Sequence, residues 1–261
     1  MCLVLATPVA IAAQQADSAG APKDPHEVQP ERPTVATHAG TVAPGWLELE
    51  LGGERDRYFS GEKTTSFPAN IKIGVGPRVQ VNLLASGLAG TNGNSSARGL
   101  GDITVGLKYR LLEAVPVVRD FAILPSVKFP SASAARGLGS GTTDVSLLLI
   151  SSRSLGQTDV DINVGATHHF GGESYTPKVS TLWTVSAGFP VAGRFGWAAE
   201  VYGLPGTAGE GGVKGIVAIL TGPTWQPVKW LAADAGVIEP IKGPQPRAFY
   251  AGFVWNVGKI W

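Results

Sequence analysis

The chain has 261 residues, a formal net charge of +1 and 16% charged residues. A near-neutral chain without clustered lysines and arginines gives no electrostatic basis for binding nucleic acid. Cys2 is the only cysteine, which excludes a disulfide scaffold and a cysteine-ligated metal site. No stretch reaches the roughly 18 apolar residues that a membrane helix needs. The 35 glycines and the mildly apolar composition instead favour alternating strands.

The first 44 residues divide into two parts of different composition. Residues 1–13 form an apolar stretch that ends in small residues, and Ala10-Ile11-Ala12 fits the small-x-small pattern of signal-peptide cleavage. No basic residue precedes Lys23, so we expect the leader to be truncated or its start misassigned. Residues 14–44 contain five prolines among polar residues and lack periodicity. We therefore expect residues 14–44 to form an extended, Pro-rich extension on the periplasmic side.

From Trp46 onward the sequence keeps the period of two that β-strands have. Between Asp102 and Leu111 every second residue from Ile103 onward is apolar, and Lys108 and Arg110 lie between them. A helix would spread these apolar residues around its circumference, and the frequent glycines also disfavour one. The predicted strands are 45–53, 65–75, 79–88, 100–111, 121–129, 143–151, 158–170, 179–189, 195–204, 214–225, 229–238 and 247–261.

The connections between these predicted strands alternate in length. Long connections such as 54–64, 89–99 and 130–142 alternate with short ones such as 76–78 and 190–194, and only 112–120 breaks the pattern. Outer-membrane barrels of bacteria have an even number of strands, short periplasmic turns and longer outer loops. The alternation has the correct phase if both chain ends are periplasmic. We therefore predict an all-β, up-and-down antiparallel transmembrane barrel of about twelve strands over residues 45–261.

Strand length and aromatic residues indicate that the apolar face contacts lipid. The strands are close to the 9–11 residues that a tilted membrane strand needs. Tryptophans recur near strand ends, as in the aromatic girdles of such barrels; they are Trp46, Trp183, Trp225, Trp230 and Trp261. The last strand has an aromatic face that we expect the outer-membrane assembly machinery to recognise.

The opposite, polar face would then line the lumen. The predicted channel-lining residues are Glu48, Glu50, Lys72, Lys108, Arg110, Lys128, Asp161, Glu200 and Asp234. These side chains can form a solvated or salt-bridged lumen that supports the barrel. They can equally form a polar path for solute, in which mixed charge disfavours strong ion selectivity. The sequence leaves both interpretations open.

No motif indicates catalysis, a cofactor or a metal. His168 and His169 are adjacent on a predicted strand, so they point to opposite faces and cannot chelate one metal together. Residues 137–141, Gly-Leu-Gly-Ser-Gly, lack the spacing of a nucleophile elbow and are expected to form a flexible outer loop. We therefore expect a protein that is not an enzyme and that has no cofactor.

Three stretches together resemble the outer-membrane family named for the MetA pathway of phenol degradation. Residues 31–34 (Glu-Arg-Pro-Thr) followed by 41–50 are similar to its N-terminal D-R-P-D … T-V-P-x-G-x-x-Q-x-E pattern, with Thr34 in place of Asp and Glu48 in place of Gln. Residues 99–110 resemble its central G-x-G-D strand. Residues 128–144 resemble its K-x-P … G-x-G-S-G-x-x-D stretch. The resemblance covers residues 31–261 and implies a barrel linked to uptake of aromatic or other hydrophobic compounds.

The leading hypothesis is therefore an outer-membrane channel for passive uptake of small organic compounds. Its expected partners are outer-membrane lipids, a small organic solute and the assembly machinery. Two alternatives remain from the sequence. One is a structural or adhesive barrel whose lumen is closed by side chains, and the other is a soluble periplasmic barrel that binds ligand inside.

Overall fold

The computed structural model describes residues 24–92, 95–115, 119–171, 177–207 and 214–261. The predicted leader, residues 1–13, lies outside these ranges. The strands are β1 (Trp46–Arg57), β2 (Lys63–Gly76), β3 (Val79–Asn92), β4 (Ser95–Leu100), β5 (Ile103–Val115), β6 (Arg119–Phe129), β7 (Thr143–Leu155), β8 (Thr158–Phe170), β9 (Val179–Ala192), β10 (Phe195–Leu204), β11 (Ile216–Val228), β12 (Leu231–Lys242) and β13 (Arg247–Lys259). A single 3₁₀ turn in the described part, η1 (Ala134–Arg136), precedes β7.

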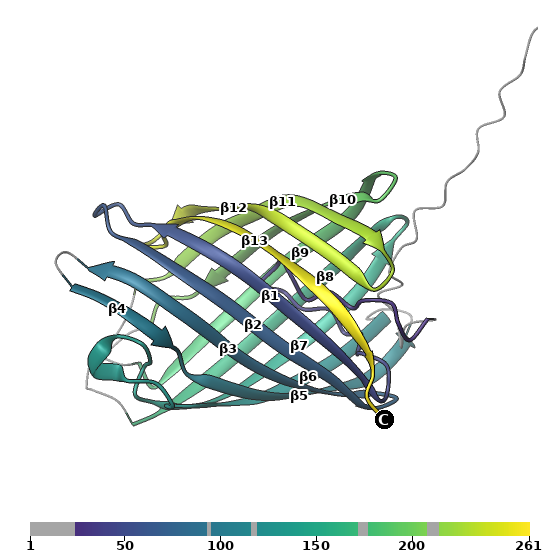
Figure 1. Ribbon diagram of the computed structural model, residues 1–261, viewed down its shortest axis with the longest axis horizontal. Coiled ribbons are helices and arrows are strands. Elements are labelled where there is room, and N and C mark those ends of the chain that lie inside the picture. The colour runs from purple at the N-terminus through teal and green to yellow at the C-terminus, as the bar shows by residue number, and fades with distance from the viewer. Residues whose placement is uncertain (1–23, 93–94, 116–118, 172–176, 208–213) are drawn as a thin grey trace, which may run out of the picture.

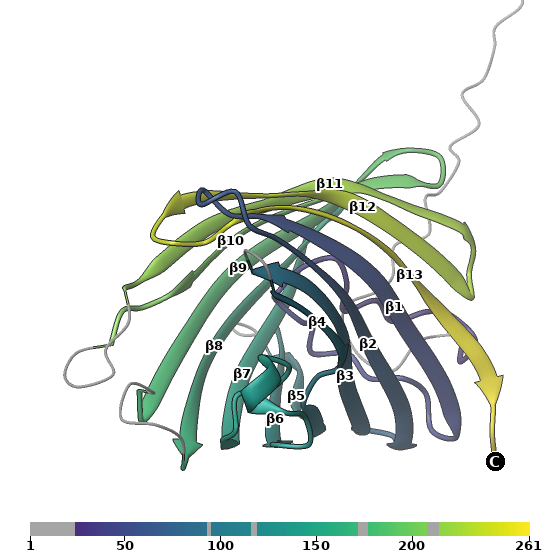
Figure 2. The same ribbon diagram turned by 60° about the vertical axis from the view of Figure 1, so that its left-hand side comes forward.

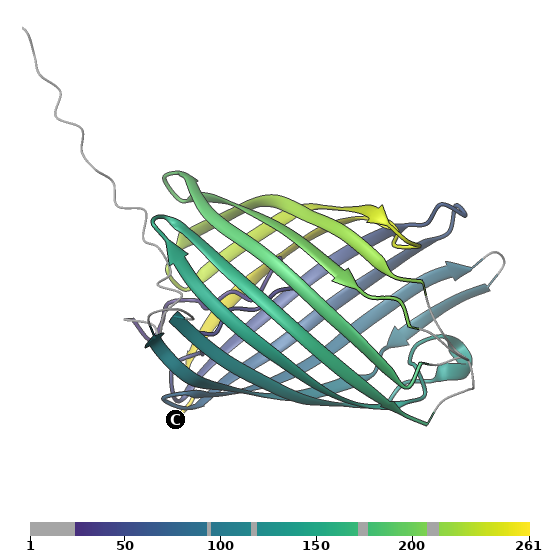
Figure 3. The ribbon, with the colours of Figure 1, turned by 180° about the vertical axis from the view of Figure 1, so that it is seen from behind.

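The strands form one closed antiparallel barrel, seen from opposite sides in Figure 1 and Figure 3. Each long strand pairs with its neighbours in sequence, and the β1–β13 pairing joins the two ends of the chain. Twelve long strands make the ring in the described residues, because the short β4 pairs with β3 alone and continues into β5. The predicted all-β, up-and-down barrel of about twelve strands is confirmed. The predicted loop 89–99 is instead largely a hairpin of β3 and β4.

The two ends of the barrel differ in the length of their connections. Short turns such as 77–78, 156–157, 193–194 and 229–230 lie at one end, which we call the short-turn end. Longer connections such as 130–142 lie at the other, the long-loop end. The expected exception at 112–120 is mostly strand, because β5 continues to Val115 and β6 begins at Arg119. In bacterial outer-membrane barrels the short turns are periplasmic.

The strands have an apolar outer face and a polar inner face. In β5 the outward Leu107 is 44% exposed, whereas Lys108 on the inner face is 0% exposed. The same inversion recurs around the ring, where Leu147, Leu149, Ile162 and Val164 are exposed outside. A water-soluble barrel would bury its apolar face, so the soluble periplasmic alternative does not fit. Closure of the ring also pairs the backbone groups that lipid could not satisfy.

The described residues contain no helix that is long and apolar enough to span a membrane.

Candidate functional site

Residues 24–44, which we call the inner segment, lie inside the barrel at the short-turn end (Figure 2). They leave the β11–β12 turn, where the Val28 N–H donates to the Lys229 carbonyl, and reach β2, where Pro44 bridges to Gly74. The sequence predicted an extended, Pro-rich segment on the periplasmic side over residues 14–44. Residues 14–23 lie outside the described ranges, and residues 24–44 lie in the lumen at the short-turn end.

Seven backbone N–H groups of the inner segment donate hydrogen bonds to lumen-facing side chains. The pairs are Gln29 with Glu48, Glu31 with Glu50, Val35 and Ala36 with Glu200, Thr37 with Asn163, Ala39 with Ser152, and Val42 with Gln80, all at 2.7 or 2.8 Å. A buried extended chain cannot satisfy its own N–H groups and needs acceptors from elsewhere. The strands supply these acceptors, which explains why so many inward side chains are carboxylates or amides.

Two buried lysines anchor the middle of the inner segment. Lys72 lies 2.6 Å from Glu48 and 2.7 Å from Glu50, and its ammonium also donates to the Gln29 carbonyl. Lys108 pairs with Glu31 and donates to the carbonyls of His38 and Gly40 at 2.9 and 3.1 Å. Charges removed from water are stable only when paired and hydrogen-bonded. This cluster therefore ties the segment to β1, β2 and β5.

The same cluster shifts the protonation of two side chains on the inner segment. Burial alone would raise the pKa of Glu31, but the nearby Lys108 and Lys72 hold this pKa well below its usual range. Burial, reinforced by the charge of Lys108, lowers the pKa of His38 to about 3. Glu31 is therefore an anion and His38 is neutral at physiological pH.

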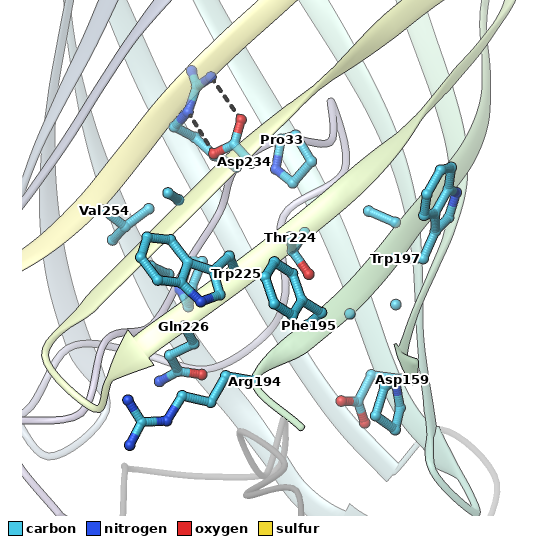
Figure 4. Close-up of a pocket in the computed structure, with 18 of the residues that line it drawn as sticks. Pro33, Asp159, Arg194, Phe195, Trp197, Thr224, Trp225, Gln226, Asp234 and Val254 are labelled. Carbon is cyan, nitrogen blue, oxygen red and sulfur yellow. Dashed lines mark hydrogen bonds and ion pairs between the residues drawn. The ribbon is translucent and has the colours of Figure 1, made fainter. Parts of the chain in front are cut away.

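A further ion pair joins the inner segment to β12. The Arg32 guanidinium donates to both carboxylate oxygens of Asp234 on β12, at 3.1 and 3.2 Å, marked by dashed lines at Asp234 in Figure 4. The guanidinium lies against Gly52 and Gly252, which pair across β1 and β13. A side chain at either glycine would collide with it. Glycine at these two positions therefore makes room for Arg32.

A cavity of about 880 Å³ separates the inner segment from the wall of β8–β12. Its wall includes Asp161 of β8, Ala198 of β10 and Thr224 of β11, and Pro33 and His38 contribute from the inner segment. Figure 4 shows side chains of this region around the open space. Residues of the short turns, among them Gln157 and Lys229, also line the cavity. The inner segment therefore fills only part of the lumen, and the remaining space reaches the short-turn end.

Nearer the long-loop end, the inner face of β10–β13 is apolar. Its buried cluster consists of Tyr202, Ala218, Leu220, Ile238, Ala248 and Tyr250. Only polar side chains were predicted to face the lumen, so this apolar cluster was not predicted. The available signal was that β11 and β12 are apolar on both faces, as are residues 145–150.

All nine predicted channel-lining residues lie on the inner face, and most of them are buried. Glu48, Glu50, Lys72 and Lys108 come together in the charged cluster, while Glu200 and Asp234 hold the inner segment at other points. The remaining three stay apart from this cluster. Asp161 accepts a hydrogen bond from Ser152, Arg110 binds the Pro77 carbonyl, and Lys128 pairs with Asp144.

Several side chains that hold the inner segment were also not predicted from the sequence. They are Glu31, Arg32, Gln80, Ser152 and Asn163. Glu31 and Arg32 belong to the motif that carries the family resemblance, and this motif was the one available signal. Among the residues described, no group of three or more side chains is arranged to hold a metal ion.

A closed barrel with an apolar outer wall and a polar interior is a transmembrane β-barrel of the Gram-negative outer membrane. The chain belongs to the family described as the MetA-pathway of phenol degradation, whose sequence profile matches residues 31–244.

Solved structures share the fold. An outer membrane channel from Pseudomonas putida F1 aligns with a TM-score of 0.62 at 14% identity, over 82% of this chain and 96% of that chain. The KdgM porin aligns with a TM-score of 0.51 at 10% identity, over 80% of this chain and 98% of that chain. None of the curated proteins is similar enough in sequence to match the chain.

Proposed function

We propose that the protein is a passive outer-membrane channel that admits small organic compounds, aromatic and other hydrophobic ones among them. The observation that carries the proposal is the cavity of about 880 Å³ beside the inner segment. Ligand sites for small molecules typically enclose about 300–1,000 Å³. The buried cluster nearer the long-loop end makes that part of the inner wall apolar, which suits such compounds better than charged ones. The family's link to phenol degradation and the structural neighbour described as an outer membrane channel support the same function.

The path that we propose runs between the inner segment and β8–β12. Four of the seven hydrogen bonds and the ion pairs of Lys72 and Lys108 fix the inner segment to β1–β7, whereas the cavity opens toward β8–β12. The residues predicted to line the channel then have two roles. Asp161 and Asp234 border the path, whereas Glu48, Glu50, Lys72 and Lys108 hold the segment beside it.

A matched pair of substitutions tests this path. Ala198 faces the cavity, and its neighbour Ala199 faces outward on the same strand. We expect Ala198→Trp to reduce the uptake of a radiolabelled monoaromatic compound several-fold in intact cells, where the lipopolysaccharide leaflet limits unaided diffusion. Ala199→Trp should leave uptake unchanged. Wild-type cells that take up the compound no faster than cells without the protein would instead support a structural or adhesive barrel with a closed lumen.

We also infer that lipids and the assembly machinery are the partners of the outer wall. Phe249, Phe253 and Trp255 lie exposed on the outer face of β13, the strand that closes the ring on β1. An assembly factor that recognises aromatic residues would find them there before closure. Deletion of residues 257–261 should sharply reduce the amount of folded, heat-modifiable protein in the outer membrane. Normal amounts after the deletion would contradict this role.

A further inference from the structure

The β6–β7 connection, residues 130–142, folds onto the inner wall at the long-loop end, and we call it the mouth loop. Its main contact is Asp102, which precedes β5 and lies on the lumen-facing side of the wall. One oxygen of this carboxylate accepts the Ala132 N–H at 3.0 Å, and the other accepts the Ser140 N–H at 3.0 Å. The sequence predicted a flexible outer loop at residues 137–141. A loop held at both ends by one carboxylate is instead fixed.

A network of side chains across four strands strengthens this attachment. Lys128 of β6 lies 3.5 Å from Asp102 and 2.6 Å from Asp144 of β7. Asp144 also accepts hydrogen bonds from Thr142 of the loop, at 2.7 Å, and from His169 of β8, at 2.9 Å.

The second ring nitrogen of His169 lies 2.9 Å from the Ser180 hydroxyl of β9. This order of serine, histidine and aspartate is similar to that of a catalytic triad. Because Asp144 is shared with Lys128 and Thr142, we interpret the arrangement as a brace under the mouth loop. His168 points outward beside Phe170, so the two histidines lie on opposite faces as predicted.

Local packing restricts the mouth loop to one conformation. Leu138 is buried against β4, where a Cβ at Gly99 would lie 2.7 Å from its Cδ1 atom. A Cβ at Gly139 would approach the Asp102 carboxyl carbon to 2.9 Å. Gly137 and Gly141 have φ angles of +67° and +70°, a region that other residues rarely adopt. The glycines that suggest a flexible loop in the sequence therefore allow this close packing.

We propose that the mouth loop is a fixed constriction that sets the largest solute the channel admits, and that Asp102 is its positioning residue. The proposal rests on the channel function proposed above. The loop occupies the inner side of the wall of β5–β7, so it narrows the opening ahead of the apolar cluster and the cavity. Its ties pair opposite charges with one another, so the loop should discriminate by size more than by charge.

The test releases the loop and then locks it again. Asp102→Ala should raise single-channel conductance and increase the uptake of a bulky two-ring aromatic several-fold, with little change for a single-ring compound. In the same background, Gly99→Cys with Leu138→Cys places two cysteines where the loop contacts β4. Oxidation should restore the wild-type size limit, and reduction should remove it again. Glu239→Ala is the matched control, because it removes an exposed carboxylate that pairs with Arg247 away from the loop.

A second variant keeps the proposal testable if Asp102→Ala does not fold. Leu138→Ser loosens the apolar contact, leaves every ion pair in place, and should widen the size limit in the same direction. Folded Asp102→Ala or Leu138→Ser protein with the wild-type size limit would overturn the proposal. In that case a continuing loss of uptake in Ala198→Trp would leave the channel function itself standing. Failure of the wild-type protein to transport any of the compounds would overturn the channel function instead.

Discussion

Within the described part of the chain, two irregular stretches lie in the lumen, and they come from opposite ends of the barrel. The inner segment lies at the short-turn end, and the mouth loop lies at the long-loop end. Both are held by inward carboxylates that accept backbone N–H groups, Glu200 for the inner segment and Asp102 for the mouth loop. Each also has a lysine in its network. Lys108 is 0% exposed, whereas the side chain of Lys128 is 20% exposed.

Because of this difference in burial, similar hydrogen-bonding networks should stabilise the two stretches to different extents. An ion pair removed from water leaves an uncompensated charge when one partner is deleted, and that charge cannot be hydrated. A partly exposed pair loses little, because water replaces the missing partner. We therefore expect the inner segment to be a permanent part of the fold and the mouth loop to be the part that substitutions can adjust.

Replacement of the two lysines should separate the regions most clearly. Lys108→Met leaves Glu31 buried without its partner, and removal of one member of a buried pair typically costs about 3–5 kcal/mol. Lys128→Met should cost less, because Lys128 itself is partly exposed and Asp144 keeps its hydrogen bonds from Thr142 and His169. The free energy of unfolding in urea, followed by heat-modifiability in lipid, measures both. Similar losses in the two variants would contradict the comparison.

A double substitution tests how much of this loss comes from the unpaired charge on Glu31. Glu31→Met combined with Lys108→Met removes both charges and should recover part of the stability that Lys108→Met loses. No recovery would show that the hydrogen bonds from Lys108 to the inner segment's carbonyls matter more than the charge on Glu31.

The next largest effect is expected at Glu200. Glu200→Ala leaves the N–H groups of Val35 and Ala36 without their acceptors, and an unsatisfied buried donor costs about 1–3 kcal/mol. Faster amide exchange at these two residues and a higher ion conductance should follow. Glu200→Gln keeps one acceptor oxygen and should fall between Ala and the wild type. Unchanged exchange in Glu200→Ala would mean that other contacts hold the segment.

The sequence predicted the wall of the barrel well because alternation is a local property. Lys108 and Leu107 differ by one position, and period-two geometry alone places them on opposite faces. The inner segment could not be predicted in this way. Its partners lie far away in the chain, as with Ala36 and Glu200, and residues 24–44 have no periodicity of their own.

Other features of the lumen could not be predicted from the sequence for the same reason. The sequence placed Lys108 on the lumen face without deciding between a salt-bridged and an open lumen, and only the position of residues 31–40 shows that it is fully buried. The mouth loop has the glycines of a flexible loop, and its fixed conformation depends on Asp102, which lies in a different connection. A sequence pattern records the face of a residue, but it does not record what covers that face.

A smaller effect is expected where Arg32 lies against Gly52 of β1. Gly52→Ala should displace the guanidinium from Asp234 and weaken the inner segment by about 1 kcal/mol, because the flexible side chain can move aside. Gly53→Ala is the matched control, since its Cβ would meet nothing closer than Phe67 at 3.9 Å. Urea unfolding compares the two variants. Equal stability would show that Arg32 can rearrange without losing Asp234.

The last prediction concerns pH and again distinguishes the inner segment. The pKa of His38 is lowered from an ordinary value of 6.5 to about 3 by burial and by the charge of Lys108. Below pH 6.5, His38 binds a proton when the inner segment is detached or unfolded, but not when the segment is bound in the lumen. The stability that is present above pH 6.5 is therefore lost progressively as the pH falls toward 3. Glu31, whose pKa is also lowered, adds a loss that begins only below its ordinary value of 4.5. Two other charges act on the pKa of His38, which Glu31 raises and Lys72 lowers.

Amide exchange of residues 35–39 should therefore be faster at about pH 5 than at about pH 7, after correction for the intrinsic exchange rate. His38→Gln removes the titrating ring and should flatten this difference. It should leave the further loss below pH 4.5 in place, because that part belongs to Glu31. Exchange that is equally slow at both pH values in the wild type would show that protonation of His38 is not linked to the seating of the segment.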